Sequence, residues 1–139
     1  MKICIVDDNP GKLSDIKEYV KKCLPDAEIH AYEYANDLLA FIHNHVEEIR
    51  ANPDEWFVIT DMQMPRAKMS RIEVDCGYDV LAEMQRQGLT CSAAVASSEP
   101  IDENRAKQLY SCYKDFIYYK VYRDLSGDFR RFLIGEEGS

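Results

Sequence analysis

The sequence predicts an α/β fold: a doubly wound parallel sheet of five strands with helices on both faces. Short apolar segments alternate five times with segments whose apolar residues recur at helical spacing. Polar or charged residues follow each apolar segment, as expected where buried parallel strands reach the edge of a sheet. Regular strand–helix alternation is typical of parallel sheets joined by right-handed crossovers.

The predicted strands are short and largely apolar, and they cover residues 3–6, 27–34, 56–60, 92–96 and 116–119. Asn9 and Pro10 supply a cap and a first residue for a helix that ends before Pro25. The later helices are predicted from their apolar stripes over residues 36–51, 78–87, 100–113 and 124–133. Residues 66–75 show no clear period and are predicted to be an exposed loop.

A doubly wound sheet of this kind has the strand order 2-1-3-4-5, the flavodoxin-like order. Its switch point, where ligands usually bind, lies between the first and third strands. At 139 residues the natural expectation is one domain, over residues 1–134, with a short tail over 135–139.

Composition excludes several classes of function. A net charge of −8 argues against nucleic-acid binding by this domain itself. The sequence has no apolar run long enough to span a bilayer, and acidic residues follow the N-terminal strand too soon for a signal peptide, so we expect a cytoplasmic protein.

Cys4, Cys23 and Cys112 lie on apolar faces, which indicates packed, reduced thiols. His43 and His45 point to different helix faces, which disfavours a metal pair.

Polar residues that carry chemistry follow the predicted strands. Asp7 and Asp8 follow the first strand, Asp61 the third, Ser97 the fourth, and Lys120 ends the fifth. Taken singly, each could be a cap, a turn residue or a solvated charge. Together they converge on one sheet edge, where crowded carboxylates need a cation and oxygen ligands suit Mg²⁺. A carboxylate nucleophile with Mg²⁺, a lysine and a hydroxyl predicts phosphoryl transfer to an aspartate.

The same residues resemble the receiver domain of two-component response regulators, a CheY-like fold, over roughly Lys2 to Leu133. The stretch Asp61-Met62-Gln63-Met64-Pro65 is the most specific part of the resemblance. The resemblance implies a role for each matching position: phosphate acceptor for Asp61, Mg²⁺ ligands for Asp7, Asp8 and the Gln63 backbone carbonyl, switch hydroxyl for Ser97, and phosphoryl contact for Lys120.

Three features depart from the family pattern. Val121 stands where the family has a proline joined by a cis peptide, so we expect a trans bond there, because a cis bond to a non-proline residue costs roughly 3 kcal/mol. Ile117 stands at the position of the switch aromatic, which puts the usual coupling in question. Ser98 replaces a small alanine, and the loop after Pro65 is longer than the family's.

The longer loop has two interpretations. It is either a solvated surface loop, or its basic residues Arg66, Lys68 and Arg71 shield the phosphoryl group or dock a partner. Glu99, close to Ser97, is a further candidate modulator of the site.

The resemblance implies a phospho-accepting receiver, and not an enzyme beyond self-catalysed phosphorylation and dephosphorylation. A histidine kinase or histidine phosphotransfer protein would be the donor. A downstream protein, or a second copy in a homodimer, would bind the face made by the fourth helix, the fifth strand and the last helix. The alternative is a phosphorylation-independent interaction module. A phosphatase of the haloacid dehalogenase type is disfavoured, because Asp7 and Asp8 are adjacent. The chain is either a stand-alone receiver or a piece of a longer regulator.

Overall fold

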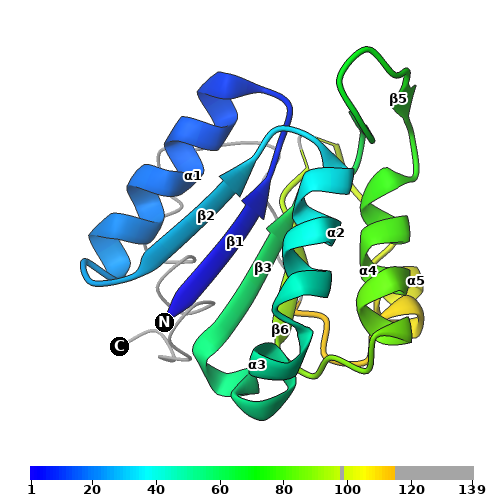
Figure 1. Ribbon diagram of the computed structural model, residues 1–139. Coiled ribbons are helices and arrows are strands. Elements are labelled where there is room, and N and C mark those ends of the chain that lie inside the picture. The colour runs from blue at the N-terminus through cyan, green and yellow to red at the C-terminus, as the bar shows by residue number, and fades with distance from the viewer. Residues whose placement is uncertain (98, 115–139) are drawn as a thin grey trace.

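The computed structural model describes residues 1–97 and 99–114. Four parallel strands form its main sheet in the order β2-β1-β3-β6, with bounds Glu28–Tyr32, Lys2–Val6, Trp56–Thr60 and Ser92–Val95 (Figure 1). The α/β class and the switch point between the first and third strands are therefore confirmed. The predicted fifth strand, the last helix, the Lys120–Val121 bond and the boundary at residue 134 lie outside the described residues.

The chain lies beside β6 just before the predicted fifth strand. Ala93 and Tyr113 form an isolated parallel bridge, and the Lys114 amide donates to the Ala93 carbonyl at 2.8 Å. The described chain thus reaches the edge of β6 on the side where the predicted strand order places a fifth strand.

The helices differ from the prediction at their ends. The described helices are α1 (Pro10–Cys23), α2 (Ala35–Asn44), α3 (Val46–Ala51), α4 (Cys76–Arg86) and α5 (Glu103–Leu109), with a 3₁₀ turn, η1, at Pro53–Glu55. The single helix predicted over 36–51 is wrong, because His45, with φ −119° and ψ 14°, separates α2 from α3. Leu38, Ile42 and Ile49 stay buried on both sides of the break. The apolar stripe therefore continues across the break, and periodicity alone does not show it.

Two further predictions need correction. The helix predicted from Pro100 begins at Glu103, where the Asp102 side chain accepts a hydrogen bond from the Arg105 amide at 3.1 Å. It ends at Leu109, so residues 110–113 lie beyond it. The predicted loop over 66–75 contains one short strand, β5 (Ile72–Glu73), which pairs antiparallel with β4 (Met64–Pro65) just before the loop.

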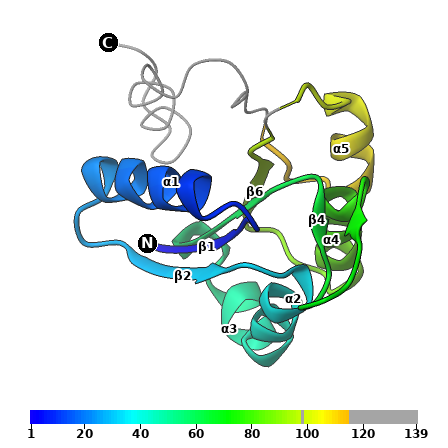
Figure 2. The ribbon, with the colours of Figure 1, turned by 90° about the horizontal axis from the view of Figure 1, so that it is seen from above.

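Alternate side chains of the strands pack on opposite faces of the sheet, as the pleat requires. Ile3 and Ile5 of β1 pack against α1, whereas Cys4 and Val6 pack in the larger cluster with α2, α3, α4 and α5. Figure 2 shows α1 on one side of the sheet and α2 and α3 on the other. Every residue of β3 is buried, so this strand lies at the centre of the described fold.

The five cysteines are free thiols, three of them buried (Cys4, Cys76 and Cys91) and two half-buried (Cys23 and Cys112). Among the helices of the described residues, none is long and apolar enough to cross a membrane.

Candidate functional site

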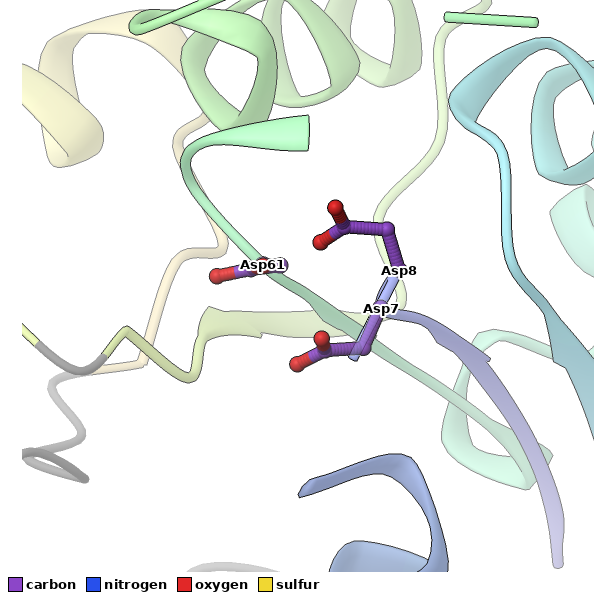
Figure 3. A group of neighbouring side chains, drawn as sticks. All are labelled: Asp7, Asp8 and Asp61. Atoms are coloured by element: carbon purple, nitrogen blue, oxygen red, sulfur yellow. The ribbon is translucent and has the colours of Figure 1, made fainter. Parts of the chain in front are cut away.

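Three aspartates meet at the carboxyl end of the sheet, as predicted from the parallel order. Val6 and Thr60 are paired in the ladder, so Asp7 and Asp61 leave β1 and β3 at the same level. The Asp61 amide donates to the Val6 carbonyl at 2.9 Å, which holds the two strand ends together. One carboxylate oxygen from each of Asp7, Asp8 and Asp61 lies within 4.8 Å of the others (Figure 3). We call these three residues the acidic cluster.

Backbone hydrogen bonds orient two of the carboxylates. Asp7 Oδ1 accepts from the Asn9 amide at 2.9 Å, and Asn9 Oδ1 in turn caps α1 by accepting from the Lys12 amide at 3.1 Å. Asp61 Oδ1 accepts from the Met62 amide at 2.8 Å. The sequence that starts α1 therefore also fixes Asp7, because one short turn serves both purposes.

Burial raises the pKa of each carboxyl in the acidic cluster. Asp7 is 1% exposed, and desolvation is the main cause of its raised pKa, opposed by the nearby ammonium of Lys12. Desolvation likewise raises the pKa of Asp61; the ammonium of Lys12 lowers it, and the negative charge of Asp7 raises it further. The pKa of Asp8 is raised by partial burial and then by the charge of Asp61. The three carboxylates of the acidic cluster therefore need a positive charge nearby if all of them are to be ionised.

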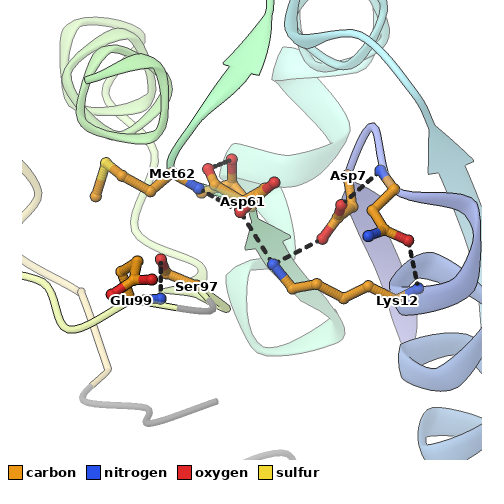
Figure 4. Close-up of polar contacts among 8 residues, drawn as sticks. Asp7, Lys12, Asp61, Met62, Ser97 and Glu99 are labelled. Carbon is orange, nitrogen blue, oxygen red and sulfur yellow. Dashed lines mark hydrogen bonds and ion pairs between the residues drawn. The ribbon is translucent and has the colours of Figure 1, made fainter. Parts of the chain in front are cut away.

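Lys12 supplies one such charge, and it was not predicted from the sequence. Its Nζ lies 2.9 Å from Asp7 Oδ2 and 2.9 Å from Asp61 Oδ1, and its side chain is 3% exposed (Figure 4). Lys12 is the third residue of α1, where a positive charge opposes the helix dipole. A lysine in the first helical turn directly after an acidic pair is the signal that could have pointed to it.

The acidic cluster fits a magnesium ion in donor chemistry. Mg²⁺ takes oxygen ligands near 2.1 Å in an octahedron, so its ligand atoms lie about 3 to 4.2 Å apart. The three carboxylates each offer an oxygen within 4.8 Å of the others, so a small inward movement would bring all three into that range. In addition, Asp7 Oδ2 is buried, and the group paired with it among the described residues is a cation, the ammonium of Lys12 at 2.9 Å. Such an oxygen can serve as a cation ligand.

An open pocket of about 220 Å³ lies over the acidic cluster, and its lining consists of polar side chains: Asp7, Asp8, Asn9, Lys12, Asp61, Gln63, Ser97 and Glu99. Ser97 is buried, and its hydroxyl accepts from the Glu99 amide at 3.1 Å. The structure therefore brings together the site residues predicted at the ends of the first, third and fourth strands. Lys120, predicted at the end of the fifth, lies outside the described residues.

Comparison by sequence gives no family model and no curated protein that matches this chain. Solved structures do match. A DNA-binding response regulator of the LuxR family from Staphylococcus aureus aligns with TM-score 0.65 and 18% identity over 95% of this chain and 98% of its own. A receiver domain from Rhodospirillum rubrum aligns with TM-score 0.66 and 16% identity over 97% and 92%. The receiver domain of the histidine kinase CKI1 from Arabidopsis thaliana, complexed with Mg²⁺ and BeF₃⁻, gives 0.65 and 17% over 97% and 90%.

The chain has the fold of a response-regulator receiver domain. Within this receiver fold, Asp7 and Asp8 follow β1 and Asp61 follows β3, as the resemblance in sequence implied. At these identities the comparisons concern the fold, and the roles of the individual residues depend on the geometry of this site.

Gly77 is a second residue of the site whose role was not predicted from the sequence. It is the second residue of α4, and its amide donates to the Met62 carbonyl at 2.9 Å. A β-carbon at this position would lie 2.5 Å from the Asp61 carbonyl oxygen and 2.9 Å from Met62 Cα. Glycine therefore allows α4 to pack directly on the backbone that carries Asp61.

The hairpin of residues 64–73 projects beyond the N-terminal end of α4 (Figure 1). Arg66 pairs with Glu73 at 2.9 Å and with Asp79 of α4 at 2.5 Å, so its guanidinium fastens the hairpin to that helix. Lys68 and Arg71 are exposed, and the described residues that line the pocket include none of these three basic residues. The exposed apolar side chains Met69, Ile72 and Val74 lie in the same segment.

Proposed function

We propose that this chain is a phospho-accepting receiver of a two-component phosphorelay, with Asp61 as the acceptor. The observation that carries the proposal is the position of Asp61: its carboxylate lies in an open pocket, with an oxygen within 4.8 Å of oxygens from Asp7 and Asp8. A buried strand end that presents one carboxylate beside a divalent-ion site suits phosphoryl transfer to aspartate.

The hydrogen bonds to Asp61 favour one of its two carboxylate oxygens as the attacking atom. Lys12 and the Met62 amide both donate to Oδ1, so we assign Oδ2 as the nucleophile. Oδ2 forms a bond to phosphorus while the bond from phosphorus to the donor imidazole nitrogen breaks, and the imidazole leaves with that electron pair. The product is an aspartyl phosphate. This step requires Asp61 to be ionised, and a positive charge beside the cluster favours that form.

Asp7, Asp8, Asp61 and the backbone carbonyl of Gln63 would hold Mg²⁺, which would neutralise charge on the phosphoryl oxygens. Ser97 lines the same pocket and can donate its hydroxyl proton to a phosphoryl oxygen. Lys120, at the predicted end of the fifth strand, would supply a further cation. Each of these groups stabilises charge that spreads over the transferring group.

A histidine kinase or a histidine phosphotransfer protein is the proposed donor, in the cytoplasm. We propose that phosphorylation of Asp61 changes the face formed by α5, the predicted fifth strand and the last helix, which binds a downstream protein or a second copy of the chain. Catalysis would be limited to the chain's own phosphorylation and dephosphorylation. Glu99 is a candidate modulator because it lines the pocket and its amide binds Ser97.

The test is to incubate the chain with acetyl phosphate and Mg²⁺ and measure its intact mass. We expect a gain of one phosphoryl group in the wild type, and none in Asp61→Asn or when EDTA replaces Mg²⁺. Asp54→Asn, an exposed aspartate at the opposite end of β3, should still be phosphorylated. A folded wild-type chain that gains no phosphoryl group would contradict the proposal.

That last outcome would favour a second candidate, a receiver-like module that binds its partner without phosphate. The ion pairs from Lys12 to Asp7 and Asp61 are the observation in its favour, since they can hold the pocket in place without any reaction.

A further inference from the structure

Lys12 is paired with two of the three carboxylates that could hold a metal ion. Its ammonium lies 2.9 Å from the buried Asp7 Oδ2 and 2.9 Å from Asp61 Oδ1. The two carboxylates come from different strands, so a single side chain from α1 joins β1 and β3 at the acidic cluster. Figure 4 shows the lysine crossing from α1 to lie between them.

This lysine does not stabilise the helix that carries it. A positive charge in the first turn of a helix is disfavoured by the helix dipole, and burying an ammonium is unfavourable unless it is paired. Two buried carboxylates provide that pairing here. Because the side chain is 3% exposed, its contribution lies in neutralising the acidic cluster and not in solvation of the surface.

A divalent ion at the acidic cluster would use the same anions. A bound Mg²⁺ and the ammonium of Lys12 would draw on the same two carboxylates and would repel each other in a buried pocket. Binding of Mg²⁺ is therefore expected to weaken at least one of the two lysine ion pairs. Metal binding and the lysine ion pairs are therefore linked equilibria.

We propose that Lys12 is a tethered cation that competes with Mg²⁺ for the acidic cluster: it stabilises the metal-free pocket and weakens metal binding. The inference rests on the proposed function in that it assigns Mg²⁺ to these aspartates, and it adds a residue that regulates this site. The receiver then takes up its metal only against an internal competitor, so the Mg²⁺ concentration controls its readiness for phosphorylation.

The test is a calorimetric titration of the metal-free full chain with Mg²⁺. Lys12→Met, which keeps most of the side-chain stem, is compared with the wild type. Lys17→Met is the matched control because Lys17 is exposed on the same helix. We expect the Mg²⁺ dissociation constant to fall by about tenfold in Lys12→Met, a change equivalent to about 1.4 kcal/mol, and to stay unchanged in Lys17→Met. An equal or weaker affinity in folded Lys12→Met would overturn the proposal.

A second measurement covers the case in which Lys12→Met does not fold without metal. In wild-type chain labelled with ¹³C-lysine, saturating Mg²⁺ is expected to shift the Lys12 Cε resonance, assigned from its loss in Lys12→Arg, and to leave that of Lys17 in place. An unmoved Lys12 resonance would refute the competition.

Both readouts omit a phosphoryl donor, so they separate this inference from the proposed function. If the chain binds Mg²⁺ in competition with Lys12 but accepts no phosphoryl group, the competition is supported and the proposed function is contradicted. If the chain is phosphorylated at Asp61 and Lys12→Met has the same Mg²⁺ affinity as the wild type, the competition is contradicted and the proposed function stands.

Discussion

The backbone of Asp61 is in close contact with Gly77, where an added β-carbon would lie only 2.5 Å from the Asp61 carbonyl oxygen. A methyl group there would have to push α4 away from the strand end or move Asp61 itself. The site and the helix packing are thus coupled through one glycine.

Gly77→Ala should therefore destabilise the fold by roughly 1–3 kcal/mol, the range for overpacking at a rigid position. Urea unfolding monitored by circular dichroism measures it. Gly11→Ala is the matched control, because its β-carbon would meet only Asn9 Oδ1 at 3.4 Å, and alanine within a helix is expected to be neutral or stabilising. Equal stability of Gly77→Ala and wild type would show that the contact is relieved at little cost.

Stability without metal should decrease as the pH rises. Burial raises the pKa of Asp7, Asp8 and Asp61 above the ordinary 3.8, so the folded state holds protons that the unfolded state has already lost. The folded state binds more protons over this window, and its stability therefore falls as the pH increases from about 4 upward. The free energy of unfolding, measured in EDTA from pH 4 to pH 8, gives this trend together with the contribution of the other titrating groups of the chain.

Asp8→Asn isolates the contribution of the acidic cluster to that trend. Removing one charge should make the metal-free variant more stable than the wild type at pH 8, with the difference shrinking toward pH 4. Asp54→Asn, remote from the pocket, should show no such convergence. If the difference in unfolding free energy between Asp8→Asn and the wild type did not change with pH, charge repulsion within the acidic cluster would not be the cause of the stability change.

A substitution in the hairpin is expected to change the rate of phosphoryl transfer from the donor protein and not the stability of the phosphoryl group on Asp61. Arg71 is exposed and does not line the pocket, and it lies beside the exposed apolar residues Ile72 and Val74. Arg71→Glu is expected to slow phosphoryl transfer from a cognate histidine donor, because the charge that would steer an acidic partner is reversed. It should leave the lifetime of the aspartyl phosphate unchanged within about twofold.

Lys17→Glu makes the same change of charge on the exposed face of α1 and should alter neither the rate of phosphoryl transfer nor the lifetime of the aspartyl phosphate.

Deleting residues 68–75 tests the shielding interpretation of the loop in the same assay. An unchanged phosphoryl lifetime after deletion would rule out that the hairpin shields the acyl phosphate.

The cysteines should differ in reactivity in the folded chain. Burial raises the pKa of Cys4 to about 12 and of Cys76 and Cys91 to about 11, so these thiols are protonated and covered at pH 8. Iodoacetamide should modify the half-buried Cys23 and Cys112 first, as read by peptide mass. All five should react in denaturant, and fast labelling of Cys4 in the folded chain would contradict the described packing.

Much of the sheet could be predicted from the sequence, because buried parallel strands are short apolar runs with a sharp polar end. Trp56–Thr60 was predicted with its observed bounds, and the first strand begins one residue earlier than predicted. The meeting of Asp7 with Asp61 followed from the strand order alone, because parallel strands end on the same edge of a sheet.

What could not be predicted depends on tertiary contacts. Lys12 has no apolar signature, and its pairing partners are distant in sequence or outside its helix. Gly77 is recognisable only once α4 is seen against the Asp61 backbone. The hairpin escaped prediction because its strands are two residues long and expose Ile72, so they carry no alternation of apolar and polar residues.

The proposed function depends above all on Asp61 being the phosphate acceptor. Borohydride reduction of the chain after incubation with acetyl phosphate and Mg²⁺ converts an aspartyl phosphate to homoserine, which peptide sequencing by mass spectrometry then locates. We predict homoserine at position 61 and unmodified aspartate at Asp7 and Asp8. Homoserine at Asp7 or Asp8, or at no position in the folded chain, would contradict the assignment.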